Sequence, residues 1–138
     1  MDKEQMEKRC PTSTLLGKGV LNDYTLGFTI YSPKRKCGCA DIIKSSGKEV
    51  WGLIYSVTPE DIESLDYHEG APIHYRRIQV EIIDGTGNRL RAETYEVVNK
   101  SAVPLVTSED YLSKLTTAAK IFSFPETYQE FLNSFSTI

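Results

Sequence analysis

Apolar and polar positions alternate along much of the chain in the manner of half-buried strands, with turn residues between them. Asn22-Asp23, Ser46-Gly47 and the stretch 84–88, rich in Gly, Asp and Asn, supply three of these turns. The pattern predicts six strands, at residues 20–21, 24–31, 39–43, 50–57, 74–83 and 90–98. The last two would form an antiparallel hairpin across the 84–88 turn.

Four helices are predicted from their start and stop signals. The first covers residues 2–9, with Asp2 as its cap, and ends at Cys10-Pro11. A second follows Thr58, which can cap it, and stops at Gly70. The third covers 108–121, and the fourth begins at residue 125 with its aromatic residues on one face.

These elements do not alternate regularly as βαβ units, which favours the α+β class. We expect a small, mostly antiparallel β-barrel of about six strands with short flanking helices. The absence of repeats, linkers and low-complexity stretches predicts one domain over residues 1–138.

Composition narrows the class of protein further. The 138 residues are 40% hydrophobic and 25% charged, typical of a globular domain. The net charge of −3 argues against a nucleic-acid partner. No apolar run reaches the ~18 residues of a membrane span, and the charged N-terminus is unlike a signal peptide. Three cysteines are an odd count for a disulfide scaffold. We therefore expect a cytoplasmic protein.

Glu69 is the most informative candidate for chemistry. At about 100° per residue, Ile62, Leu65, Asp66 and Glu69 share one face of the predicted second helix. Burial and the negative end of the helix dipole would both raise the pKa of Glu69, as suits a general base. We expect it to line the largest polar-floored pocket. The alternative from the pattern alone is that Glu69 simply pairs with an arginine or a backbone amide.

Other chemical groups are weaker candidates. Cys37-Gly38-Cys39 resembles half of a metal clip but lacks a second pair of ligands, so we expect reduced thiols without metal. Cys10 could be a nucleophile only if His68 or His74 reached it. His68 points off the inner face of its helix, and the basic triplet 34–36 is interpreted as a solvated turn.

Several segments, in order, resemble the gamma-glutamylcyclotransferase-like family over nearly the whole chain. The matching residues are Met1, Met6, Arg9-Cys10-Pro11, Leu21-Asn22-Asp23-Tyr24, Ala40-Asp41-Ile42, Val50-Trp51-Gly52-Leu53-Ile54-Tyr55, Leu65-Asp66-Tyr67-His68-Glu69-Gly70, Tyr75-Arg76-Arg77 and Ala92-Glu93-Thr94-Tyr95. The resemblance implies a small β-barrel and a reaction without a cofactor. A γ-glutamyl amine or amino acid would cyclise to 5-oxoproline and release its amine.

The resemblance also implies roles for residues. The family's general acid/base falls on Glu69, and Tyr95 and Tyr75 match substrate-contacting positions. We expect the Tyr95 hydroxyl within reach of the Glu69 carboxylate through at most one bound molecule.

In the family, a strand ending in Tyr-Gly-Ser-Asn precedes the helix that starts here at Met1, and its loop cradles the glutamyl group. Either that strand lies upstream of the sequence given, or Met1 is the true start. In the second case we expect a sheet lacking one strand, whose edge a homodimer or a shifted N-terminal helix could cover. The alternative function is a non-catalytic small-molecule-binding module on the same fold.

Overall fold

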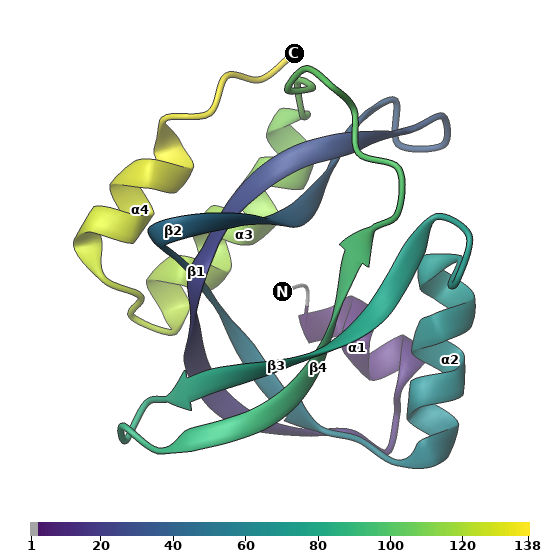
Figure 1. Cartoon of the computed structure of the whole chain (residues 1–138), viewed down its shortest axis with the longest axis vertical. Coiled ribbons are helices and arrows are strands. Elements are labelled where there is room, and N and C mark those ends of the chain that lie inside the picture. The colour runs from purple at the N-terminus through teal and green to yellow at the C-terminus, as the bar shows by residue number, and fades with distance from the viewer. Residues whose placement is uncertain (1–2) are drawn as a thin grey trace.

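The computed structural model describes residues 3–138. Its elements are α1 (Lys3–Arg9), β1 (Thr14–Ser32), β2 (Cys37–Ser56), α2 (Pro59–Glu69), β3 (Tyr75–Asp84), β4 (Arg89–Val97), α3 (Glu109–Ile121) and α4 (Glu126–Asn133). Figure 1 shows the strands in the middle, with α3 and α4 on one side and α1 and α2 on the other. The α+β class predicted from the sequence is confirmed.

The strands form one antiparallel sheet in the order β2-β1-β3-β4. The prediction of six strands is wrong, because the first four predicted strands merge into the two long strands β1 and β2. Within the described residues, β2 and β4 are the edges and do not pair with each other, so the sheet is open. The closed barrel is therefore not confirmed.

The two predicted turns inside β1 and β2 are irregularities of strand pairing. The register of the β1–β2 ladder shifts between Asn22 and Tyr24, where residues 45–48 of β2 bulge out. Asp23 has a φ of 65°, and its carboxylate accepts a hydrogen bond of 3.0 Å from the amide of Gly47. Polar residues that tolerate positive φ thus bend the long hairpin instead of ending its strands.

The predicted helices are confirmed apart from Asp2, which lies outside the described residues. Thr58 and Asp61 form a reciprocal capping box at the start of α2. Gly70 ends α2 in the left-handed conformation, with a φ of 65°. These local signals fix where α2 stops, and so place Glu69 in its last turn.

The main core lies between the β1–β2 hairpin and the two C-terminal helices. Phe28 of β1 packs against apolar side chains of α3 and α4, among them Leu112, Leu115, Tyr128 and Leu132. A smaller cluster, made of Leu21, Ile42 and Ile82, lies within the sheet itself. This packing places α3 and α4 on the side of the strands that is away from α2 (Figure 1). None of the helices within residues 3–138 has the length and apolar character to cross a membrane.

Candidate active site

Glu69 lies where α2 ends and faces α1. Its side chain is 29% exposed, and its Oε1 atom lies 3.8 Å from a guanidinium nitrogen of Arg9. Ile62, Leu65 and Asp66 are half-buried, whereas Tyr67 and His68 are exposed. The predicted inner face of α2 is confirmed, although Ile62 and Leu65 belong to neither core cluster.

Burial raises the pKa of Glu69, as expected, and is the largest influence on it. The positive charges of Arg9 and Arg35 oppose that shift. The pairing with arginine that the sequence left open is thus present. At 3.8 Å it is an ion pair longer than a hydrogen bond, so the carboxylate oxygens remain able to accept protons from a ligand.

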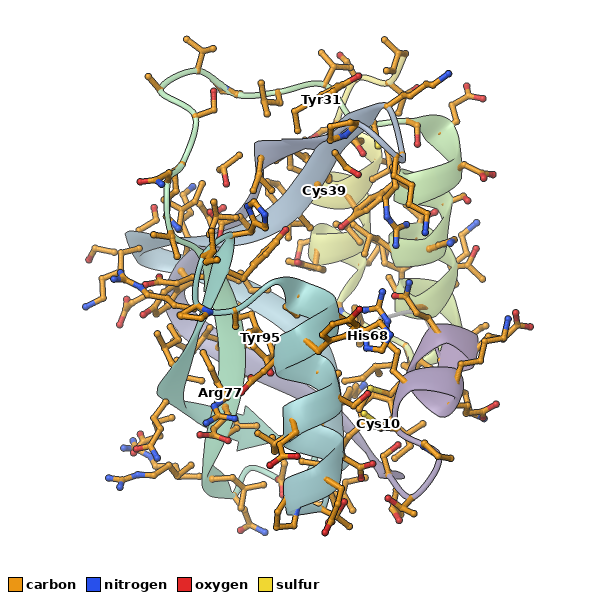
Figure 2. The ribbon with its side chains drawn as sticks, turned by 90° about the vertical axis from the view of Figure 1, so that its right-hand side faces the viewer. Cys10, Tyr31, Cys39, His68, Arg77 and Tyr95 are labelled. Carbon is orange, nitrogen blue, oxygen red and sulfur yellow. The ribbon has the colours of Figure 1, made fainter. Side chains whose placement is uncertain are left out.

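Tyr95 reaches α2 one turn before Glu69. Its hydroxyl donates to a carboxylate oxygen of Asp66 at 2.5 Å, and the other oxygen of Asp66 accepts from Arg77 at 3.1 Å. Figure 2 shows Tyr95 and Arg77 on the sheet side of α2. Burial, the bond to Asp66 and the charge of Glu69 all raise the pKa of Tyr95. Asp66, which the helical wheel placed beside Glu69, holds the Tyr95 ring in place.

Two further tyrosines meet at the open edge of β2. The Tyr75 hydroxyl donates to the carbonyl of Ala40 at 3.0 Å, and the amide of Ala40 donates to the Tyr111 hydroxyl at 3.0 Å. The charge of Glu69 acts on both tyrosines, although burial is the leading cause of their raised pKa values. The pKa of Tyr111 is raised to about 12, so its hydroxyl is neutral at physiological pH.

Tyr111 was missed by sequence reasoning, and the hydrogen-bond directions give it a distinct chemistry. Tyr75 and Tyr95 have given their hydroxyl protons to protein acceptors, so their oxygens can only accept from a ligand. The Tyr111 oxygen accepts from Ala40, which leaves its proton able to donate.

Arg35 extends the site from the turn between β1 and β2. Its guanidinium lies 5.4 Å from the centre of the Tyr111 ring, a cation–π distance. Residues 34–36 are exposed and lie in a turn, as predicted, and Arg35 makes this contact with Tyr111 in addition.

Two hollows among the described residues bear on the expectation that Glu69 lines the largest polar-floored pocket. A hollow of about 700 Å³ lies over the sheet, lined by residues such as Asn22, Lys44 and Arg89. A smaller, apolar hollow of about 350 Å³ lies beside Phe28 and Phe135. Neither is lined by Glu69 or its neighbours.

The cysteine and histidine candidates do not come together. The Cys10 thiol is buried between α1 and α2 and donates to the carbonyl of Asp61 at 3.5 Å (Figure 2). Burial raises its pKa, the opposite of what activates a nucleophile. The Nδ1 atom of His68 forms a hydrogen bond with the backbone carbonyl of Ser64, at 2.8 Å. Within residues 3–138, no three His, Cys, Asp or Glu residues are grouped as metal ligands.

Known proteins resemble this chain in both sequence and fold. A model of the AIG2-like family matches residues 49–132, which include Glu69, Tyr75, Tyr95 and Tyr111. The chain is 30% identical to the gamma-glutamylcyclotransferase of Bos taurus over 138 residues, covering 95% of this chain and 71% of that protein. The chain belongs to this AIG2-like, gamma-glutamylcyclotransferase-like family.

A solved structure and a relative with a different name also resemble this gamma-glutamylcyclotransferase-like chain. A structure described as gamma-glutamyl cyclotransferase superimposes with a TM-score of 0.89 at 26% identity, over 98% of this chain and 82% of that one. The gamma-glutamylaminecyclotransferase C of Danio rerio is 43% identical over 60 residues, covering 42% of this chain and 40% of that protein. These relatives support a function of the cyclotransferase type.

Proposed function

We propose that this protein cyclises a γ-glutamyl amine or amino acid to 5-oxoproline and releases the amine, with Glu69 as general acid/base. The observation that carries the proposal is the half-buried Glu69 carboxylate, whose pKa burial raises. A base with a pKa nearer neutrality can both take up a proton and return it. The relatives named gamma-glutamylcyclotransferase support the same reaction.

The substrate contains its own nucleophile. Its α-amine attacks the γ-carbonyl carbon, a ring C–N bond forms, and the C–N bond to the leaving amine breaks. Glu69 takes the proton from the attacking nitrogen and delivers a proton to the leaving nitrogen, so it ends in its starting state. Because the reaction is intramolecular, holding the folded substrate supplies much of the acceleration.

The three tyrosines have different roles in this proposal, because their hydrogen bonds to the protein run in different directions. Tyr75 and Tyr95 offer oxygens that can accept hydrogen bonds from the N–H groups of the substrate's α-amine. Tyr111 offers a proton to the oxygen of the γ-carbonyl, where negative charge develops during attack. No cofactor takes part in this scheme.

The decisive experiment incubates the protein with γ-glutamyl dipeptides and measures 5-oxoproline. Turnover by the wild type and its loss in Glu69→Gln would support the proposal. Binding of the dipeptide without 5-oxoproline would favour the alternative, a non-catalytic binding module. The proposal includes a cytoplasmic setting and leaves room for a homodimer, which light scattering on the purified protein would test.

The proposed reaction does not by itself specify which amine is released. Of the relatives, one is named for γ-glutamyl compounds in general and another for γ-glutamylamines. An amino acid and a simple amine differ in a carboxylate, so the charges around Glu69 bear on the choice.

A further inference from the structure

Two arginines converge beside Glu69 from different elements. Arg9 ends α1, and Arg35 lies in the turn between β1 and β2. With its amide oxygen turned toward them, Gln5 accepts a hydrogen bond of 3.0 Å from each guanidinium. The charges of both arginines oppose the upward shift in the pKa of Glu69. Two positive charges therefore face one carboxylate.

The two arginines differ in how their charge is used. Arg9 lies 3.8 Å from Glu69 and is only 21% exposed. No carboxylate of residues 3–138 lies within ion-pair distance of Arg35. Of the nearby acids, Asp66 is paired with Arg77 and Asp41 with Lys100. Arg35 thus brings to the rim of the site a positive charge that forms no ion pair with a carboxylate of residues 3–138.

Resting on the proposed cyclisation, we propose that Arg35 selects γ-glutamyl conjugates whose released amine carries a carboxylate. In an amino acid the carboxylate is attached to the carbon next to the amine nitrogen. Since Glu69 must return a proton to that nitrogen, the carboxylate is brought close to Glu69, and two anions there would repel each other. A neighbouring cation that is not paired with a carboxylate of the described residues reduces this repulsion. An amine without a carboxylate gains nothing from that cation.

The chemistry of Arg35 suits this role. A guanidinium binds a carboxylate through two parallel N–H donors, which a lysine cannot do. The Tyr111 ring beneath the guanidinium and the Gln5 oxygen at its side limit the directions in which it can point. The opposite carboxylate, on the glutamyl part of the substrate, is common to all conjugates and cannot produce a preference among leaving groups.

The test compares γ-glutamyl-L-alanine with two conjugates that lack the leaving carboxylate, γ-glutamyl-L-alaninamide and γ-glutamylethylamine. For the wild type we expect kcat/KM to be about tenfold higher for the alanine conjugate, the size of one charge-assisted hydrogen bond. Arg35→Gln should remove this preference by slowing only the alanine conjugate. Lys34→Gln, which removes the same charge from the same exposed turn, should keep it. High salt should weaken the preference of the wild type.

The other possible outcomes would each refute a specific part of the proposal. Equal rates on all three conjugates in the wild type would refute the selectivity. If Arg35→Gln lowers kcat/KM equally for all three conjugates, Arg35 acts on the glutamyl part of the substrate. That result would refute its role toward the leaving group. If the protein binds the conjugates without turnover, the ratio of their Kd values in the wild type and in Arg35→Gln decides the inference by itself. Neither turnover nor binding would refute the proposed function, and this inference with it.

Discussion

The carboxylate of Asp41 on β2 accepts a hydrogen bond from the backbone amide of Val97 on β4, at 2.8 Å, and so joins the two edge strands of the open sheet. The same buried carboxylate accepts from the Thr29 hydroxyl at 2.7 Å and pairs with the Lys100 ammonium at 2.8 Å. A side chain thus replaces backbone pairing where the sheet does not close. Asp41 directly follows Ala40, whose backbone binds two tyrosines of the candidate site.

We expect Asp41→Ala to lower the free energy of unfolding by about 3–5 kcal/mol, because Lys100 and a buried backbone amide lose their partner. Urea denaturation at neutral pH measures this loss. Glu130→Ala, which removes an exposed carboxylate from α4, should stay within about 0.5 kcal/mol of the wild type. Equal midpoints for the two variants would mean that Asp41 does not hold the sheet edges together.

Glu69→Gln should abolish 5-oxoproline formation while leaving the fold neutral or mildly stabilised. The folded-state pKa of Glu69 is raised, so the native protein holds this proton to higher pH than the unfolded chain does, and the ionised carboxylate costs stability. The advantage of Glu69→Gln should therefore be present at pH 7 and disappear as the pH falls below the ordinary value of 4.5.

Chemical denaturation of both proteins across this pH range measures that difference. A Glu69→Gln protein that still forms 5-oxoproline would remove Glu69 from the mechanism. A stability difference that grows on acidification would contradict the raised pKa.

The position of Glu69 could be predicted because its determinants are local. Thr58 starts α2, Gly70 stops it, and the helical period sets which face Glu69 occupies. The strand count could not be predicted in the same way. Asn22-Asp23 signals a turn as well as a bulge, and only pairing with β2 across the hairpin decides between the two.

The rest of the candidate site depends on contacts between distant segments. Arg35 and Tyr111 meet only after α3 has packed against the β1–β2 hairpin, so the local sequence around Arg35 indicates a solvated turn. Likewise, the Tyr75 and Tyr95 hydroxyls find protein acceptors on Ala40 and Asp66 that no spacing rule connects to them.

The three cysteines should be unreactive in the native protein. Cys10, Cys37 and Cys39 are buried, and burial raises the pKa values of Cys10 and Cys39, so little thiolate forms at neutral pH. A chromogenic disulfide reagent should find no accessible thiol in the folded protein and three per chain in denaturant. A rapidly reacting thiol before unfolding, or stoichiometric zinc in the purified protein, would contradict this expectation.

Tyr111→Phe should lower kcat about a hundredfold with little change in KM, because the hydroxyl proton that it removes would act on the charge developing in the transition state. Tyr75→Phe is the matched control. Each variant breaks one hydrogen bond to the backbone of Ala40 and should lower the free energy of unfolding by a similar ~1 kcal/mol. The Tyr75 proton is committed to a carbonyl, so its loss should act mainly on KM.

Steady-state kinetics and thermal denaturation of the two variants, measured side by side, separate catalysis from folding. A common change in Tm with a fall in kcat confined to Tyr111→Phe supports the assignment, since a purely structural role would affect both variants alike. Equal losses of kcat in both would show that the Ala40 segment, and not the Tyr111 proton, controls the rate. An unchanged kcat in Tyr111→Phe would leave the developing charge to a donor other than Tyr111, because phenylalanine keeps the ring beneath Arg35 and removes only the hydroxyl.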